Sequence, residues 1–306
     1  MVGIVIKSTG SQYLVRTEAQ MVLLCKIRGN LRLKGFEATN PLTVGDKVDI
    51  EMVDGDETAW VTGIHERKNY IIRKSIKLSK QVQILAANID RAFVVATPAM
   101  PKTSTGFLDR FLATAEAYAI PGGIIWNKCD LYDEPTWDFI AEMTEVYEAI
   151  GYKVFAVSAT NGIGLDELNS ELNGKISLLS GHSGVGKSSL INALVPGLAL
   201  KTGGLSSQHQ KGTHTTTFAE MHTLPAGGYI IDTPGIREFG TIDFDKYEVS
   251  HFFPEIFKAG KDCKFGNCLH DQELDCAVKR AVENGEIAIS RYTSYLSVLY
   301  GEDIFR

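Results

Sequence analysis

The chain has 306 residues, 44% of them hydrophobic and 22% charged, which is the composition of a soluble globular protein and a length sufficient for two or three domains. Lys7 interrupts the N-terminal apolar run and no stretch approaches the ~20 apolar residues of a membrane span, so we expect a cytoplasmic protein with neither signal peptide nor membrane segment. The formal net charge of −6 argues against a general nucleic-acid coat but permits local basic patches.

Residues 1–66 are predicted to form a small all-β barrel. The runs "MVGIVIKS", "YLVRT", "MVLLCKIRG", "KVDIEMV" and "AWVTGIHE" are short, rich in β-branched residues and separated by glycine, asparagine and aspartate turns. Cys25 lies within one of these apolar runs, and we do not expect it to bind metal.

Two basic stretches accompany the barrel. The segment "CKIRGNLRLK" carries four basic residues and no acid, and the predicted linker 67–80, "RKNYIIRKSIKLSK", carries six and no acid. Together they predict an electrostatic stripe for RNA phosphates, with a merely solvated surface as the alternative. The candidate RNA contacts are Lys26, Arg28, Arg32, Lys34, Arg67, Lys68, Arg73 and Lys74.

Residues 81–244 alternate between apolar strand runs and segments of helical period. Strand runs such as "RAFVVAT", "GGIIWN" and "KISLLSG" are separated by helical segments such as "FLDRFLATAEAY" and "DFIAEMTEVYEAI". This alternation predicts an α/β domain in which helices flank a parallel sheet.

The motif "NKCD" follows a predicted strand, which places it at the carboxyl edge of the sheet, where α/β proteins bind ligands. The carboxylate of Asp130 can accept from both N1–H and the 2-amino group of guanine, whereas adenine would leave it unpaired. Asn127 can contact the other edge of the base, and the stem of Lys128 can lie along the ring. Ser158 and Ala159 end the next strand, where a backbone N–H can donate to guanine O6. A four-residue match can also be a surface turn, so the motif needs support from elsewhere in the chain.

The motif "GHSGVGKS" fits the pattern G-x-x-x-x-G-K-[ST] and lies between an apolar strand and the helix-competent segment "SLINALV". Its glycines let backbone N–H groups face phosphate oxygens, Lys187 would reach the β- and γ-phosphates, and Ser188 would bind Mg²⁺. A glycine-rich turn without a ligand is the alternative. The predicted phosphate contacts are Gly181, His182, Ser183, Gly184, Val185, Gly186, Lys187, Ser188 and Ser189.

Two further segments complete a nucleotide site. In "YIIDTPG", Asp232 can hold Mg²⁺ through water, and the amide of Gly235 can approach the γ-phosphate. Between this strand and the phosphate loop lies "QKGTHTTT", where a hydroxyl of Thr215 or Thr216 can close over Mg²⁺; the spacing does not choose between the two threonines. The combination of these motifs predicts a domain that binds GTP with Mg²⁺.

Residues 245–306 are predicted to form a zinc-binding module with helices. Cys263, Cys268, His270 and Cys276 supply three thiolates and one imidazole, which fill a tetrahedral zinc site and leave no open position for catalysis. Free buried cysteines are the alternative. We expect His251 and Cys129 to lie outside the site, and we expect the stripe formed by Tyr292, Tyr295, Leu296 and Leu299 to be a packing face.

The order of the nucleotide motifs is a cyclic shift of the usual GTPase order. Here the base motif and the Ser-Ala strand end precede the phosphate loop, the threonine segment and D-x-x-G. With "NKCD", "GHSGVGKS", "HTTT", "DTPG" and the Cys/His cluster, the whole chain resembles the circularly permuted GTPases that depend on the small ribosomal subunit, the RsgA type.

The resemblance implies an N-terminal OB-fold barrel, a central circularly permuted P-loop GTPase and a C-terminal zinc module. It also implies a late maturation factor of the small ribosomal subunit that binds ribosomal RNA, hydrolyses GTP to GDP faster on the subunit and then leaves. We expect a monomer with one structural Zn²⁺, Mg²⁺ bound with GTP and no membrane partner.

The catalytic group is less clearly marked. Many GTPases have a glutamine after D-x-x-G that positions the attacking water, but this chain has Ile236 there. His214 in the threonine segment is the candidate, and the resemblance points to the same position; a solvated loop histidine is the alternative. The family's switch usually has arginine where this chain has Thr213.

Two other functions remain open at the level of sequence. Ile236 is compatible with an RNA-binding module that uses GTP as an occupancy sensor with little hydrolysis. A P-loop kinase is disfavoured by "NKCD" and the threonine segment.

Overall fold

The structure, a computed structural model, describes residues 1–27, 41–52, 58–74, 82–200, 220–232 and 244–301. The chain forms two compact units. The first comprises Met1–Ala92, Glu167–Ser180 and Ile191–Glu238, and the second comprises Phe93–Asp166, Gly181–Leu190 and Phe239–Arg306. None of the helices in the described ranges has the length and apolar character required to span a bilayer.

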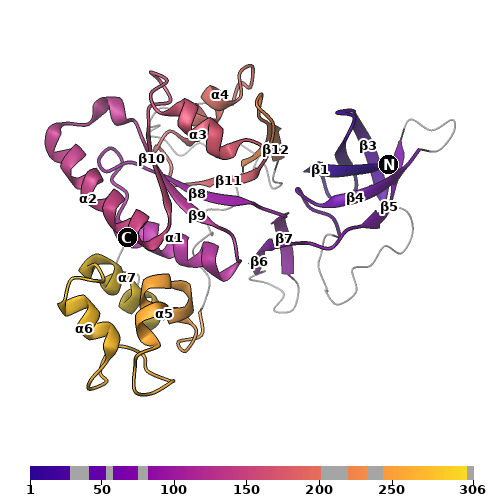
Figure 1. The fold of residues 1–306 in the computed structure, drawn as a ribbon. Coiled ribbons are helices and arrows are strands. Elements are labelled where there is room, and N and C mark those ends of the chain that lie inside the picture. The colour runs from indigo at the N-terminus through magenta and orange to yellow at the C-terminus, as the bar shows by residue number, and fades with distance from the viewer. Residues whose placement is uncertain (28–40, 53–57, 75–81, 201–219, 233–243, 302–306) are drawn as a thin grey trace, which may run out of the picture. The chain divides into compact units, whose positions relative to one another are not determined.

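The predicted N-terminal barrel is confirmed. It is built from β1 (Val2–Ser8), β2 (Tyr13–Thr17), β3 (Val22–Ile27), β4 (Lys47–Glu51) and β5 (Ala59–Ile64), which appear in the indigo part of Figure 1. Strands β1, β2 and β3 form an antiparallel meander, β3 pairs in parallel with β5, and β4 pairs with both β5 and β1, which closes the barrel. This closed, mixed pairing of five strands is the OB-like arrangement.

Alternation along the strands fills the barrel. Strand β2 places Tyr13, Val15 and Thr17 inward, and their neighbours are half-exposed. The buried cluster also contains Cys25 from β3, and burial raises the pKa of its thiol to about 11. Cys25 is therefore a core residue that stays protonated at neutral pH.

The segment predicted as a linker contains a strand. Strand β6 (Tyr70–Lys74) pairs antiparallel with β7 (Val82–Ala87). The hairpin is held at its base by Asn69, whose side chain donates to the Ile89 carbonyl and accepts from the Ile89 amide, both at 2.8 Å. A segment rich in lysine and arginine can still contain a strand, because its apolar residues, such as the buried Ile71, can pack.

Arg67 lies at the junction between barrel and hairpin and is nearly buried. Its Nε and Nη2 atoms donate to the two carboxylate oxygens of Asp46 at 2.6 and 2.7 Å, and Nη2 also reaches the Pro41 carbonyl at 3.1 Å. The Asp46 side chain is fully buried and also accepts from the Thr43 amide. This bidentate pair fixes the exit of the chain from the barrel.

The first unit also contains part of the predicted α/β domain. Strand β11 (Ile176–Ser180) runs parallel to β13 (Tyr229–Asp232), and β12 (Glu220–Thr223) is antiparallel to β13. Strand β12 also pairs with β1 of the barrel, where Lys7 and Glu220 form an ion pair at 3.1 Å.

The second unit contains the remaining parallel strands and their helices. Strand β9 (Gly122–Asn127) pairs in parallel with β10 (Lys153–Val157) and neighbours β8 (Arg91–Ala96), which begins in the first unit. The helices of the α/β domain are α1 (Thr105–Ala117), α2 (Glu134–Ile150), α3 (Leu165–Leu172) and α4 (Lys187–Leu194), of which α3 and α4 continue into the first unit. Helix α2 begins where the Asp133 side chain accepts from the Thr136 amide and ends at Gly151, whose φ is +110°.

The C-terminal module consists of short helices. They are η3 (Val249–Phe252), α5 (Pro254–Gly260), α6 (Ala277–Glu283) and α7 (Ile289–Tyr300). The predicted packing face of α7 is confirmed, because Tyr295 is buried in the core of the module and Tyr292, Leu296 and Leu299 pack against it. That core includes Ala113 of α1, so the module shares its interior with the α/β domain.

The Arg67–Asp46 pair generates a stability prediction. Arg67→Met leaves a fully buried carboxylate without its cation, so we expect barrel opening to become easier by about 3–5 kcal/mol. Hydrogen exchange of the Val5 amide, which donates to the Asp46 carbonyl at 2.9 Å, measures this opening. Lys68→Met removes an exposed ion pair with Asp90 and should cost about 1 kcal/mol or less. Equal effects of the two substitutions would contradict the assignment.

Candidate functional site

The phosphate loop is a strand-to-helix turn. Strand β11 ends at Ser180, the loop runs through Gly186, and α4 begins at Lys187. Gly186 has a φ of +87°, and a Cβ atom there would lie 2.5 Å from Nδ2 of Asn127, so only glycine fits. The first turn of α4 presents N–H groups that a helix cannot satisfy internally, which suits phosphate oxygens.

Asn127, the first residue of the base motif, ties three segments together. It is 1% exposed at the end of β9. Its Nδ2 donates to the Val185 carbonyl in the phosphate loop at 2.9 Å, and its Oδ1 accepts from the Ala159 amide at 3.3 Å. Both atoms of the carboxamide therefore bond within the protein. These bonds brace the phosphate loop, and the expected direct contact of Asn127 with the base stays a prediction, because the carboxamide keeps a second N–H and a second lone pair.

Lys128 crosses the phosphate loop. Its backbone is left-handed, with a φ of +65°, and its Nζ donates to the Gly184 carbonyl at 2.8 Å and to the Met100 carbonyl at 2.9 Å. The stem of the side chain therefore extends from the base motif toward the phosphate loop. Asp130 follows in the short helix η1 (Cys129–Leu131) and is exposed, so its carboxylate is accessible to a ligand.

The Ser-Ala strand end turns tightly after β10. The Ser158 amide donates to the Ile163 carbonyl at 3.0 Å, and the Ser158 side chain accepts from the Asn161 amide at 3.1 Å. Ser158 therefore holds the turn. The Ala159 amide donates to Asn127 Oδ1 over a longer distance of 3.3 Å, so it is the N–H that can also donate to a guanine oxygen.

Some contacts around the phosphate loop were not foreseen from the sequence. The ring of His182 lies 3.9 Å, centroid to centroid, from the ring of Phe107 near the start of α1. Tyr132 donates through its hydroxyl to the Asn127 carbonyl, and burial raises the pKa of that hydroxyl. The sequence offered one signal for a structured loop near these contacts. It is the pair of prolines after β8 in "ATPAMP", because prolines mark a turn or loop at this carboxyl edge of the sheet.

The Mg²⁺ candidates are only partly described. Ser188 lies in the first turn of α4, and Asp232 ends β13 in register with Leu179, two residues before Gly181. A hydroxyl after the phosphate loop and a carboxylate at the end of the neighbouring strand are the oxygen ligands that Mg²⁺ accepts. The other candidates in the switch segments, His214, Thr215, Thr216 and Gly235, lie outside the described residues, as do Thr213 and Ile236.

The predicted zinc ligands converge in the C-terminal module. The ligand atoms of Cys263, Cys268, His270 and Cys276 all lie within 4.8 Å of one another. The Sγ of Cys276 lies 3.8 Å from those of Cys263 and Cys268, and Nδ1 of His270 lies 3.5 Å from the Sγ atoms of Cys263 and Cys276. Tetrahedral zinc with ordinary bond lengths requires S–S separations of about 3.8 Å and S–N separations of about 3.5 Å. The geometry is compatible with one structural zinc ion.

Surrounding residues hold the ligand loop in place. Glu273 accepts from the backbone amides of Leu269 and Asp271 at 2.6 and 3.0 Å. The hydroxyls of Tyr292 and Tyr295 on α7 donate to the carbonyls of His270 and Leu269 at 2.6 and 2.8 Å. These bonds orient the ligands through their backbone, which is the usual function of groups around a metal site.

The protonation of the cluster follows from its burial. Without metal, burial raises the pKa of the Cys268 thiol to about 12, raises that of Cys276, and lowers that of His270. Zinc binds thiolates, so loading the site releases protons and becomes more favourable as pH rises. His251 is exposed and packs its ring against Phe257, outside the cluster.

The RNA candidates differ in their surroundings. Lys26 is exposed on β3, and Lys68 is exposed beside Asp90. The guanidinium of Arg67 is engaged by Asp46, which removes it from the surface available to RNA. Arg28, Arg32 and Lys34 lie outside the described residues. For Arg73 and Lys74 the structure describes the backbone, which forms the end of β6.

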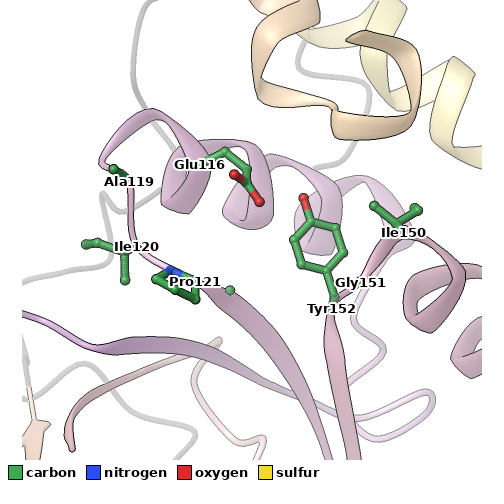
Figure 2. Close-up of a pocket in the computed structure, with 8 residues that line it drawn as sticks. Glu116, Ala119, Ile120, Pro121, Ile150, Gly151 and Tyr152 are labelled. Atoms are coloured by element: carbon green, nitrogen blue, oxygen red, sulfur yellow. The ribbon is translucent and has the colours of Figure 1, made fainter. Parts of the chain in front are cut away.

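A pocket of about 360 Å³ opens at the opposite, amino ends of β9 and β10. Figure 2 shows Glu116 and Tyr152 pointing toward each other there. Burial raises the pKa of Glu116. Because ligands of α/β proteins bind at the carboxyl ends of the strands, where Asn127 and Ser158 lie, this pocket is distinct from the candidate nucleotide site. Its lining residues are Glu116, Ala119, Ile120, Pro121, Gly122, Ile150, Gly151 and Tyr152.

Comparison with known proteins shows matches over the whole chain. Residues 64–242 match the family model described as RsgA GTPase, and residues 2–61 match the RsgA N-terminal domain. The chain is 55% identical to the small ribosomal subunit biogenesis GTPase RsgA of Bacteroides fragilis, covering 98% of this chain and 96% of the relative. It is 53% identical to the protein of the same name from Porphyromonas gingivalis, covering 100% and 98%.

Two solved structures resemble it closely. YjeQ from Thermotoga maritima has a TM-score of 0.82 and 36% identity, covering 98% of this chain and 97% of the other. YloQ, described as a circularly permuted GTPase, has a TM-score of 0.78 and 32% identity, covering 98% and 94%. The expected combination of an OB-like barrel and a circularly permuted GTPase is confirmed.

The ligand cluster yields a prediction about metal. Cys276→Ser removes a buried thiolate, so we expect the purified protein to lose its single equivalent of zinc and the segment 263–276 to become protease-sensitive. Zinc content by a chromogenic chelator and limited proteolysis measure the two effects. Cys25→Ser, in the barrel core, is the control and should retain zinc. Full zinc content in Cys276→Ser would refute the ligand assignment.

Proposed function

The chain belongs to the RsgA family of circularly permuted GTPases, and we propose that it hydrolyses GTP as a late maturation factor of the small ribosomal subunit. The support for the subunit as partner is the name of the relatives, which cover nearly the whole chain at 53–55% identity. We further propose that it acts as a monomer in the cytoplasm, where its named relatives would meet assembling subunits.

The observation that carries the nucleotide assignment is the bracing of the phosphate loop by the base motif. Asn127 and Lys128 bond to the Val185 and Gly184 carbonyls at 2.9 and 2.8 Å. A chance "NKCD" turn on the surface would have no reason to touch a phosphate loop 58 positions further along the chain. We therefore propose that the two motifs form one site, in which these bonds hold the base motif and the phosphate loop at a fixed spacing.

Guanine selectivity follows from the chemistry of Asp130. A carboxylate accepts two hydrogen bonds side by side, which matches N1–H and the 2-amino group of guanine. The exposed position of Asp130 lets it meet the base, and the adjoining Ala159 amide can donate to guanine O6. Adenine carries an amino group where guanine carries O6, so it would place donor against donor.

The phosphate end would neutralise the charge of the triphosphate. The loop amides and Lys187 would hold the phosphate oxygens, while Ser188, Asp232 and one of Thr215 and Thr216 would hold Mg²⁺. Bound Mg²⁺ would offset the charge that develops on the β- and γ-oxygens. Gly235 would approach the γ-phosphate from the segment after β13.

Hydrolysis requires a group that orients water, and Ile236 cannot do so. We propose that His214 takes this role and that the small subunit completes the catalytic arrangement. A slow reaction in the free protein and a faster one on the subunit follow from this arrangement. The family usually has arginine at the position of Thr213. In this chain another residue would have to make the contribution of that arginine.

The remaining parts would hold the protein on its partner. We propose that the Cys₃His cluster carries one structural zinc ion, which stabilises a module with few long helices. We also propose that the basic residues of the barrel and hairpin, Lys26 and Lys68 among the described ones, contact ribosomal RNA through its phosphates.

Exchange of the base-reading carboxylate tests the guanine site. Asp130→Asn removes the charged acceptor, so GTP affinity should fall by roughly 10–100-fold. Xanthine has an oxygen in place of the 2-amino group, and the side-chain amide introduced by this substitution can donate to it, so affinity for xanthosine triphosphate should rise. Equilibrium titration of both nucleotides measures the switch. Asp133→Asn, three residues away at the cap of α2, is the matched control and should retain the preference for GTP.

Phosphate release tests the function itself. With purified small subunits we expect strong stimulation of GTP hydrolysis, and His214→Ala should lower the stimulated rate by about 100-fold while leaving GDP affinity unchanged. His222→Ala in β12 is the control and should be stimulated like the parent protein.

The other outcomes have distinct meanings. No turnover with or without subunits would support a GTP occupancy sensor, and phosphate transfer to an acceptor would support a kinase. Equal loss in both histidine variants would remove His214 as the specific catalytic candidate.

A further inference from the structure

A buried ion network joins the C-terminal module to the α/β domain. Arg291 on α7 is 1% exposed, and its Nη1 donates to Oδ1 of Asp109 on α1 at 2.8 Å. Its Nε and Nη2 donate to the carboxylate of Glu255 on α5 at 2.7 and 3.2 Å. The hydroxyl of Tyr147 on α2 donates to the same Asp109 oxygen at 2.7 Å. One guanidinium thus connects four helices of the second unit.

The electrostatics make this junction rigid. Burial alone would lower the pKa of Arg291, but the adjacent Asp109 and Glu255 outweigh it and hold that pKa well above its ordinary value. The rings of Phe253, Tyr152 and Tyr147 surround the guanidinium at 4.8–5.9 Å. Because a buried charge cannot leave its partner without a large penalty, α1 and α7 keep one relative placement.

The same N-terminal part of α1 also lies against the phosphate loop. The ring of Phe107, two residues before Asp109, lies against the ring of His182 at a tilt of 31°. The loop that leads into α1 also touches the site, because Pro101 lies against Gly184 and the Met100 carbonyl accepts from Lys128. Helix α1 starts immediately afterwards, where the Ser104 side chain caps the Phe107 amide.

Phe107 and Asp109 therefore lie on one helix at a separation of only about 3 Å along its axis. A displacement of the phosphate loop that moves Phe107 also moves Asp109. Because Asp109 is bound to Arg291, the displacement then reaches α7. This route is independent of the chain segment 233–243 that leads from D-x-x-G to the module.

We propose that Arg291 is a positioning residue for the nucleotide site, which acts through Asp109 and α1 on the phosphate loop. Nucleotide affinity and the resistance of α7 to local opening are thereby coupled. The inference rests on the proposed binding of guanine nucleotide at this loop.

Two carboxylates on the same guanidinium provide a matched comparison. Asp109→Asn cuts the link to α1, whereas Glu255→Gln removes a partner that belongs to the module itself. We expect Asp109→Asn to weaken GDP binding by about fivefold or more and Glu255→Gln to leave it within error of the wild type. Binding is measured by titration with fluorescent GDP on the full-length, zinc-loaded protein, well below each unfolding midpoint.

A double-mutant cycle tests the path through the helix. If Phe107 transmits the effect, the losses of GDP affinity in Phe107→Leu and Asp109→Asn should be non-additive, whereas those of Phe107→Leu and Glu255→Gln should add. Simple destabilisation would make both pairs additive and would overturn the proposal.

Reciprocity supplies a second readout that a purely structural role would not change. GDP should slow hydrogen exchange in α7 around Arg291 in the wild type, and Phe107→Leu should abolish that protection while the helix remains folded. Unchanged α7 exchange on GDP binding, or equal affinity losses in Asp109→Asn and Glu255→Gln, would overturn the coupling. Failure of the wild type to bind GDP would instead refute the nucleotide site.

Discussion

The two hydrogen bonds of the Asn127 carboxamide hold together the segments of the proposed nucleotide site. The carboxamide is buried at the end of β9, donates to the phosphate loop and accepts from the strand end at Ala159. A buried amide that lost either bond would carry the full cost of desolvation, so three segments are held at one spacing. The close packing around Asn127 also requires glycine at position 186, because any side chain there would collide with the Asn127 amide.

This arrangement explains why the reversed motif order is harmless. The contacts between the base motif and the phosphate loop are hydrogen bonds at the carboxyl ends of strands. None of these bonds depends on which segment comes first in the chain. Circular permutation therefore preserves the site while moving the chain ends. The barrel now precedes β8, and the C-terminal module follows the segment "DTPG", so each accessory domain is attached next to a different part of the GTPase.

The C-terminal module relies on partners beyond its own apolar residues. Its helices are short, from four to twelve residues, and its core is completed by Ala113 of α1. The Cys₃His cluster gathers the ligand loop, and the Arg291 network attaches α7 and α5 to α1 and α2. A small domain with a limited core requires such supports, and here the Arg291 network reaches α1, whose Phe107 contacts His182 in the phosphate loop.

The sequence by itself determined the barrel, the alternating α/β pattern, the nucleotide motifs and the Cys/His cluster, because turn residues, strand periodicity and motif spacing are local properties of the chain. Only the tertiary structure decided that the basic run 67–80 contains a strand, that Arg67 is buried against Asp46, and that Asn127 bonds inward. The same holds for Asp109 and Arg291, which are separated by 182 positions. Such partners carry no local pattern, since the folded chain alone brings them into a shared interior of low dielectric, where one charge requires the other.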